Sequence, residues 1–180
     1  MRREVRILRK NVYDFLHTTV LPKAEPPVLE IGPMQYKWTP VKKYFVDTRK
    51  FFHCKGYSYA ACDVDPASGS EVLCSVLDLE QHLPRQSFGS VIALEVLEHV
   101  GPVWKVPEIF WNLLKPGGQL FLSVPYYFYR HAPFPDYWRI SQDGLNLLFG
   151  PRFDVQISPL ILRDERQPIQ YTAVCRKKRQ

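Results

Sequence analysis

The chain has 180 residues, 46% of them hydrophobic and 23% charged, and its formal net charge is +6. This composition excludes a disordered chain and predicts a folded protein with a sizeable core. No apolar run approaches the length of a membrane span, and the first residues lack the apolar core of a signal peptide. We therefore expect no membrane span and a cytoplasmic protein.

The positive charge is concentrated at the two ends of the chain. Five basic residues lie among residues 1–10, and the C-terminal end carries Arg176, Lys177, Lys178 and Arg179. Basic tails can contact nucleic acid or anionic lipid, although ordinary solvated ends are the simpler explanation. The four cysteines form no Cys-x-x-Cys pair, which favours buried, reduced thiols. Nucleic acid therefore remains a candidate partner, and the oligomeric state is not fixed.

The first half of the chain predicts two helices and three strands. Residues 3–20 have the spacing of an amphipathic helix, which Pro22, Pro26 and Pro27 end. A second helix is expected at residues 41–53, with Thr39 as its N-cap. Strands are expected at residues 28–32, 57–63 and 72–77, with a loop at 65–70.

The second half continues this alternation of strands and helices. Strands are expected at residues 88–94 and 119–124, separated by a helix at 102–114 and a turn at 115–118. Pro107 is expected to kink that helix or delay its start. An aromatic loop at 125–140 leads to a short helix at 141–149, with Ser141 as N-cap. Strands at 153–162 and 169–175 are expected to form an antiparallel hairpin.

This order predicts an α/β, Rossmann-like three-layer sandwich around a seven-stranded, mostly parallel sheet with an antiparallel C-terminal strand. One domain is expected over residues 1–180, with an N-terminal helix and linker at 1–27, a core at 28–175 and a basic tail at 176–180. Glu30 is unusual, because a carboxylate inside an apolar strand needs a partner. Either nearby backbone amides satisfy it, or it forms the first wall of a cofactor site at the carboxyl edge of the sheet.

Five motifs follow one another along this core. They are Val28-Leu29-Glu30-Ile31-Gly32, Ala61-Cys62-Asp63-Val64-Asp65, Leu77-Asp78-Leu79-Glu80, residues 88–100 and residues 113–120. Their order and spacing resemble the class I S-adenosylmethionine (SAM)-dependent methyltransferases, particularly the small type 11 group. Two places depart from that pattern: residues 33–36 replace the glycines that usually follow Gly32, and Gly89 stands where the family often has Asp.

The resemblance implies SAM as cofactor and S-adenosylhomocysteine as product. Asp63, or alternatively Asp65, would accept hydrogen bonds from both ribose hydroxyls, unless it only forms a turn before Pro66. Asp78 and the amide of Leu79 would bind adenine, a role compatible with capping a helix. The implied cofactor-binding residues are Glu30, Gly32, Pro33, Asp63, Val64, Asp78, Leu79, Leu94 and Glu95.

A possible metal site follows the fourth strand. Glu95, Glu98 and His99 have the spacing i, i+3 and i+4, so on a helix they would share one face. Two carboxylates and an imidazole can bind Mg, Mn or Fe. Ubiquinone-pathway O-methyltransferases and small-RNA 2′-O-methyltransferases resemble this stretch and use it for a divalent metal. Many other relatives carry a similar Glu-His pair without a metal, as a polar lid or helix cap. A further imidazole such as His131 would have to converge on the site.

The loop at residues 125–140 is too aromatic to be an ordinary solvated loop, so part of it must pack or bind something. We interpret His131 as the catalytic base and Asp136 as the residue that orients it. Tyr126, Tyr137 and Arg139 are candidates for substrate binding. In the structural alternative, Asp136 pairs with Arg139 to hold the loop while Trp138 fills the core.

Taken with the resemblance, these residues predict a methyltransferase that transfers a methyl group to oxygen or nitrogen of a small or medium-sized acceptor by direct displacement. Two alternatives remain open at this point. One is a non-catalytic SAM-fold module that binds a partner, and the other is a metal-dependent RNA methyltransferase, which would bind RNA in a salt-dependent way.

Overall fold

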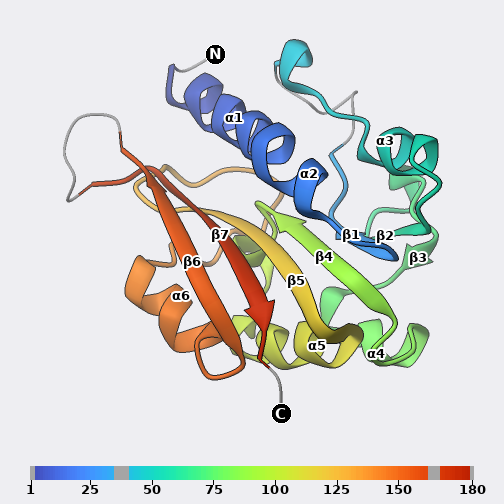
Figure 1. Ribbon diagram of the computed structural model, residues 1–180. Coiled ribbons are helices and arrows are strands. Elements are labelled where there is room, and N and C mark those ends of the chain that lie inside the picture. The colour runs from blue at the N-terminus through green and yellow to red at the C-terminus, as the bar shows by residue number, and fades with distance from the viewer. Residues whose placement is uncertain (1–2, 35–40, 162–166, 179–180) are drawn as a thin grey trace.

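The computed structural model describes residues 3–34, 41–161 and 167–178, and it contains a seven-stranded sheet in the order β3-β2-β1-β4-β5-β7-β6 (Figure 1). Strand β7 is antiparallel to both of its neighbours, so the other six strands run in one direction. The mostly parallel sheet with an antiparallel C-terminal strand is therefore confirmed. The strands are β1 Val28–Ile31, β2 Tyr59–Asp63, β3 Val72–Leu73, β4 Phe88–Leu94, β5 Leu114–Pro125, β6 Phe153–Leu160 and β7 Gln170–Lys177.

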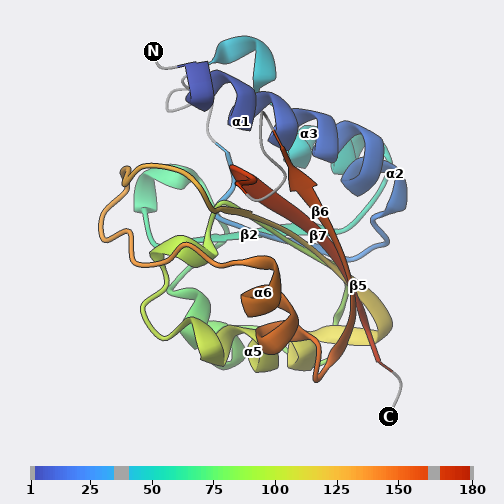
Figure 2. The same cartoon turned by 90° about the vertical axis from the view of Figure 1, so that its left-hand side faces the viewer.

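Helices cover both faces of this sheet, which gives the three layers (Figure 2). One layer holds α1 Arg3–Phe15, a π-helical turn at Leu16–Val20, α2 Leu21–Lys23 and α3 Thr48–Cys54. The other holds α4 Leu79–His82, α5 Val106–Leu113 and α6 Gln142–Phe149. Within the described residues, no helix is both long enough and apolar enough to cross a membrane.

The strands read as continuous apolar runs because successive residues pack into two different cores. Along β1, Val28 packs with the α1 layer and Leu29 with the α5 layer. Along β4, Val91 and Ile92 divide between the two cores in the same way. Because the central strands β1 and β4 are buried on both faces, ligand chemistry is expected at the edge where the parallel strands end.

Several boundaries differ from the sequence-based expectation. The second helix begins only at Thr48, where Asp47 accepts a hydrogen bond from the backbone N–H of Lys50; Thr39 lies outside the described residues. The third strand is only two residues long, because Ser75 caps a 3₁₀ turn at Val76–Asp78. The expected turn at 115–118 is an irregularity inside β5, where Phe88 pairs with Leu114 and Ser90 pairs with Gln119.

Other local expectations are confirmed. Pro107 lies in the first turn of α5, after a 3₁₀ turn at Val103–Lys105, so the helix starts late. Ser141 caps α6 by accepting a hydrogen bond from the N–H of Gly144. The four cysteines are free thiols, although Cys54 is exposed. Burial raises the pKa of Cys62 and of Cys175 to about 12, so these two thiols stay protonated.

Gly89, which departs from the family pattern, has a packing reason. A Cβ added there would lie 2.6 Å from the carbonyl oxygen of Glu25 and 2.7 Å from that of Pro26. We expect Gly89→Ala to lower the free energy of unfolding by about 2–3 kcal/mol, because backbone atoms must move to admit the methyl group. Urea denaturation measures this loss. As a control, Gly56→Ala meets nothing within 4 Å and is strained only by its φ of +72°, which costs about 1 kcal/mol. Equal losses in the two variants would contradict the packing explanation.

Candidate functional site

The carboxyl ends of β1, β2 and β4 lie side by side. Ile31, the last residue of β1, pairs with Cys62 on one side and Ala93 on the other. Gly32 follows with φ +64° and donates its N–H to the carbonyl oxygen of Cys62 at 2.9 Å. A Cβ at Gly32 would lie 3.0 Å from Cγ2 of Val96. This position therefore needs glycine both for its backbone conformation and for the close approach of the chain after β4.

Glu30 is buried beneath this edge, and within the described residues its partners are side chains rather than backbone amides. Its Oε2 atom accepts hydrogen bonds from the hydroxyls of Thr48 and Tyr59, which tie β1 to the start of α3 and to β2. Burial raises the pKa of Glu30, and the two hydrogen bonds partly oppose this shift. Glu30 therefore orients the neighbouring elements. Whether its other oxygen also contacts a cofactor remains a prediction.

Two aspartates, Asp63 and Asp65, follow the end of β2. Asp65 accepts a hydrogen bond from the N–H of Ala67 at 2.8 Å and so forms the turn before Pro66. Asp63 accepts a bond of the same kind, from the N–H of Asp65 at 2.9 Å to Oδ1, so both aspartates shape the turn after β2. Val64 between them has an exposed fraction of 72%. The turn-forming role expected of Asp65 is confirmed, and the contact of Asp63 with a ribose remains a prediction.

Asp78 and Leu79 lie at the start of α4, beyond β3. Asp78 occupies the N-cap position, but its carboxylate caps no backbone N–H; Oδ1 instead accepts from Nε2 of Gln81 at 3.2 Å. Leu79 is fully buried. The side-chain capping role is therefore wrong for Asp78, and its contact with adenine remains a prediction.

Glu95 follows Leu94, the half-buried last residue of β4, in a left-handed conformation with φ +56°. Its N–H donates to the carbonyl oxygen of Ser123 at 3.0 Å. Its Oε1 atom accepts a hydrogen bond from Nε2 of Gln170 at 2.8 Å. Gln170 was not among the predicted site residues, because its only signal is a single amide at the start of β7.

The expected metal-binding set requires a correction. Glu95, Glu98 and His99 do not share a helical face, because the left-handed residue Glu95 is followed by a 3₁₀ turn at Leu97–His99. Glu95 turns to Gln170, and His131 from the aromatic loop completes the cluster instead. Oε1 of Glu98 lies 3.6 Å from Nε2 of His99 and 3.9 Å from Nε2 of His131.

The protonation of this cluster suits a metal. Nδ1 of His99 lies 3.0 Å from the carbonyl oxygen of Pro135, and Nδ1 of His131 lies 3.0 Å from that of Ala132. A carbonyl oxygen only accepts, so each Nδ1 carries a proton; in the neutral imidazole, Nε2 then holds the lone pair that faces Glu98. Such hydrogen bonds from the second ring nitrogen are typical of metal-binding histidines. Burial also lowers the pKa of His99, which favours the neutral, ligating form.

The buried carboxylate of Glu98 is the strongest indication of a ligand site at this cluster. Its exposed fraction is 1%, and neither carboxylate oxygen has a hydrogen-bond partner in the described part of the chain. Burial raises the pKa of Glu98 well above its usual range, with Glu95 and Asp136 adding to the shift. The gaps to the two Nε2 atoms are too long for hydrogen bonds. They match ligands that each lie about 2.1 Å from one shared ion.

The aromatic loop is held by the pair that the structural alternative named. Arg139 donates to both oxygens of Asp136, at 2.6 and 2.7 Å, and also to the carbonyl oxygens of Phe128, Tyr129 and Trp138. This pairing holds the pKa of Asp136 far below its usual range. Asp136 accepts from the backbone N–H of His131 at 2.8 Å, not from its ring. Asp136 therefore positions the backbone of His131 rather than its ring, and its role as the orienting residue remains a prediction.

Backbone contacts dock this loop onto the segment after β4. The N–H of Tyr137 donates to the carbonyl oxygen of Glu98 at 2.7 Å. Nε1 of Trp138 donates to the carbonyl oxygen of Val100 at 2.9 Å. Trp138 packs against the core, as the structural alternative expected, whereas Tyr137 remains exposed. Tyr126 packs against the ring of Tyr171, with centroids 5.4 Å apart.

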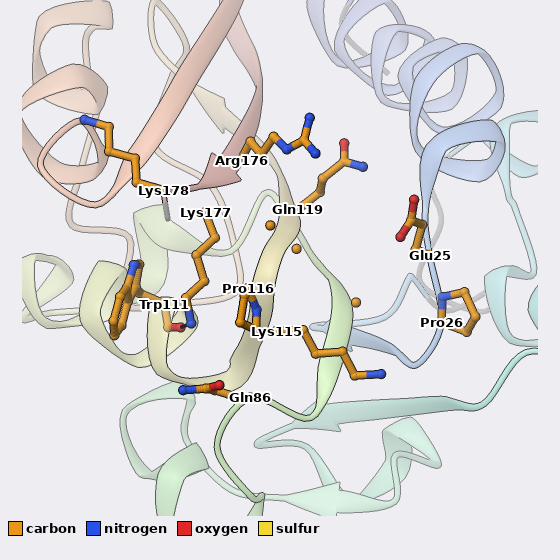
Figure 3. Close-up of a pocket in the computed structure, with 13 residues that line it drawn as sticks. Glu25, Pro26, Gln86, Trp111, Lys115, Pro116, Gln119, Arg176, Lys177 and Lys178 are labelled. Carbon is orange, nitrogen blue, oxygen red and sulfur yellow. Dashed lines mark hydrogen bonds between the residues drawn. The ribbon is translucent and has the colours of Figure 1, made fainter. Parts of the chain in front are cut away.

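A separate cavity of about 890 Å³ lies at the opposite edge, where β4 and β5 begin and β7 ends (Figure 3). Lys115 and Arg176 extend beside it, and Lys177 donates to the carbonyl oxygens of Trp111 and Leu114 at the end of α5. The cavity therefore contains part of the basic tail and none of the expected site residues. A nucleic-acid role for this tail remains a prediction.

Comparison with known proteins gives a uniform answer about the fold. No protein-family model matches the sequence, and no curated protein matches it. A SAM-dependent methyltransferase from Archaeoglobus fulgidus superimposes with a TM-score of 0.68 at 12% identity, over 94% of each chain. The N-methyltransferase NodS from Bradyrhizobium japonicum, in complex with S-adenosylhomocysteine, gives 0.64 at 13% identity, over 96% of this chain and 88% of NodS.

A third solved structure has both a cofactor product and a substrate bound. It is the 1,6-didemethyltoxoflavin-N1-methyltransferase from Burkholderia thailandensis with 1,6-didemethyltoxoflavin and S-adenosylhomocysteine. Its TM-score is 0.55 at 17% identity, over 97% of this chain and 88% of that one. The fold of the present chain is thus that of the class I SAM-dependent methyltransferases.

Proposed function

We propose that the protein is a SAM-dependent methyltransferase that acts on oxygen or nitrogen of a small or medium-sized acceptor. The observation that carries this proposal is the alignment of Gly32, Asp63 and Glu95 at the ends of three adjacent parallel strands. Open α/β sheets bind their ligands at this edge. The substrate-bound neighbour supports a small-molecule acceptor, because its structure contains 1,6-didemethyltoxoflavin.

The residues present fit the cofactor. Asp63 would hold the ribose hydroxyls, Asp78 and the Leu79 amide would hold the adenine, and Gly32 would admit the amino acid end. Pro33 and Val64 would flank these contacts, and Leu94 and Glu95 would lie beside the methyl group. When bound, SAM supplies a methyl group on a sulfonium. The chain then has only to align the acceptor for in-line displacement and, where the acceptor is a hydroxyl, to take up its proton.

His131 is the base in this proposal. Its Nδ1 proton is held by the carbonyl oxygen of Ala132, so Nε2 keeps a lone pair that can take the proton of a hydroxyl group. Asp136 fixes the loop that carries His131, and Arg139 holds Asp136. The exposed ring of Tyr137, together with Tyr126, is the proposed contact surface for the acceptor.

Calorimetry with S-adenosylhomocysteine tests the proposal. We expect the wild-type protein to bind it and Asp63→Asn to bind about 30- to 100-fold more weakly, because charge-assisted bonds to two hydroxyls are lost. Asp65→Asn is the matched control, since asparagine can still accept the turn-forming hydrogen bond from Ala67. No binding by the wild type at millimolar ligand would falsify the cofactor assignment. Binding without any turnover would favour the non-catalytic alternative.

The unpartnered carboxylate of Glu98 favours a second candidate, metal-assisted methylation of a hydroxyl group, RNA ribose included. Glu98, His99 and His131 would hold a divalent ion. When bound, such an ion lowers the pKa of a coordinated hydroxyl group. Titration of chelator-treated protein with MnCl₂ tests this candidate; no binding at millimolar Mn²⁺ counts against it.

A further inference from the structure

A chain of hydrogen bonds joins the N-terminal helix to the candidate site. Gln170, the first residue of β7, is fully buried and lies between Glu95 on one side and Asn11 of α1 on the other. Nε2 of Gln170 donates to Oε1 of Glu95 at 2.8 Å, and Oε1 of Gln170 accepts from Nδ2 of Asn11 at 2.6 Å. The three residues lie far apart in sequence, so only the folded sheet brings them together.

The chemistry of the three groups fixes their orientation. An ionised carboxylate only accepts, so the amide face that meets Glu95 must be the donor Nε2. Oε1 of Gln170 then needs a donor of its own, and Asn11 supplies it. Asn11 in turn lies on α1 between the buried residues Leu8 and Val12, so its place depends on how that helix packs. Each member of the chain thereby sets the rotamer of the next.

Glu95 has reason to need such support. It follows β4 in a left-handed backbone conformation that residues other than glycine rarely adopt. The residue is only partly buried. Gln170 binds one oxygen, Oε1, while Oε2 accepts no hydrogen bond from the described residues. One oxygen is thus anchored and the other is left for a ligand at the carboxyl edge, which is the arrangement of a preorganised electrostatic contact.

We infer that Gln170 is a positioning residue that, supported by Asn11, aims the free oxygen of Glu95 at the positively charged sulfonium of the methyl donor. This inference rests on the proposed methyltransferase function and deepens it. Helix α1 thereby acts on the candidate site indirectly, through the hydrogen bond from Asn11 to Gln170. This support gives the site a preference for the charged donor over its neutral product.

The ratio of affinities for SAM and S-adenosylhomocysteine tests this role without knowledge of the acceptor. Both ligands share the adenosine and amino acid parts, and only SAM carries the sulfonium charge. We expect Gln170→Met to lower the affinity for SAM about five- to tenfold while changing that for S-adenosylhomocysteine less than about twofold. Asn11→Leu, which leaves Gln170 in place, is expected to shift the ratio about two- to threefold in the same direction.

Two further variants separate positioning from structure. Gln156→Met, at an exposed position of β6, is the matched control and leaves both affinities unchanged. In a Glu95→Gln background, Gln170→Met should have no further effect on the ratio, because the two residues act as one unit. Equal losses of both ligands, or an effect that persists without Glu95, would overturn the inference. If Gln170→Met does not fold, Asn11→Leu answers the same question. Absence of S-adenosylhomocysteine binding by the wild type would instead overturn the proposed function itself.

Discussion

Replacing Glu98 by glutamine is expected to abolish detectable binding of Mn²⁺, with a loss of affinity of at least about 100-fold. Glu98 is the single carboxylate of the Glu98–His99–His131 cluster. Both imidazoles turn Nε2 toward it, so a bound ion would lie between these three groups. Loss of a supporting residue around a metal typically costs about 10- to 100-fold in affinity, so loss of the charged ligand costs more. Calorimetric titration of chelator-treated protein with MnCl₂ measures the effect.

Glu95→Gln is the informative control for this experiment. Helical spacing makes Glu95 a ligand together with Glu98 and His99, whereas the structure turns Glu95 toward Gln170 and puts His131 in its place. Retained Mn²⁺ affinity in Glu95→Gln, together with its loss in Glu98→Gln, is therefore expected. The opposite pattern would contradict the cluster as described.

The same Glu98→Gln replacement is expected to stabilise the metal-free protein at pH 8, by about 1–3 kcal/mol, because it removes a buried carboxylate without hydrogen-bond partners. Burial raises the pKa of Glu98, so its contribution to stability is full below the unfolded pKa of about 4.5 and is lost as the pH rises through the folded pKa. The advantage of the variant should thus shrink toward pH 4. Urea denaturation at both pH values checks this, and saturating Mn²⁺ should reverse the ranking.

Local sequence patterns were sufficient for most of the fold because the central strands β1 and β4 are buried on both faces. Phe88–Leu94 reads as a strand in the sequence and is one in the structure, since nothing but apolar packing decides it. The prediction failed where backbone details decide. The glycine-rich turn at 115–118 continues as part of β5, and the helix expected from Thr39 begins only where Asp47 can cap it.

The site was harder to predict because its contacts join distant residues. Asp136 and Arg139 are three positions apart, so their pairing could be named as an alternative from local spacing alone. Glu98 and His131 meet only because the aromatic loop docks on the segment after β4, and Gln170 reaches Glu95 only because β7 pairs with β5. The helical spacing of Glu95, Glu98 and His99 misled because it assumes a regular helix, which the left-handed Glu95 prevents.

Replacing Asp136 by asparagine is expected to release the aromatic loop and to lower the free energy of unfolding at pH 7 by about 2–4 kcal/mol. The carboxylate of Asp136 is fully buried and accepts two bonds from Arg139 and one from the backbone of His131. Asparagine cannot accept at both side-chain atoms, which leaves part of the guanidinium unpaired; breaking a buried ion pair costs this much or more. Arg139 also holds three loop carbonyls, so the loop loosens with it.

The pH dependence distinguishes this pair from a general effect on folding. Because Arg139 depresses the pKa of Asp136, the stabilising contribution is present above the unfolded pKa of about 4 and is lost as the pH falls through the folded pKa. The deficit of Asp136→Asn should therefore diminish below about pH 4. Asp154→Asn, at an exposed position of β6, is the matched control and should stay within about 0.5 kcal/mol of wild type. Since the loop carries His131, Asp136→Asn should also weaken Mn²⁺ binding about tenfold. Reduced stability with undiminished Mn²⁺ affinity would show that His131 reaches the cluster without the support of Asp136.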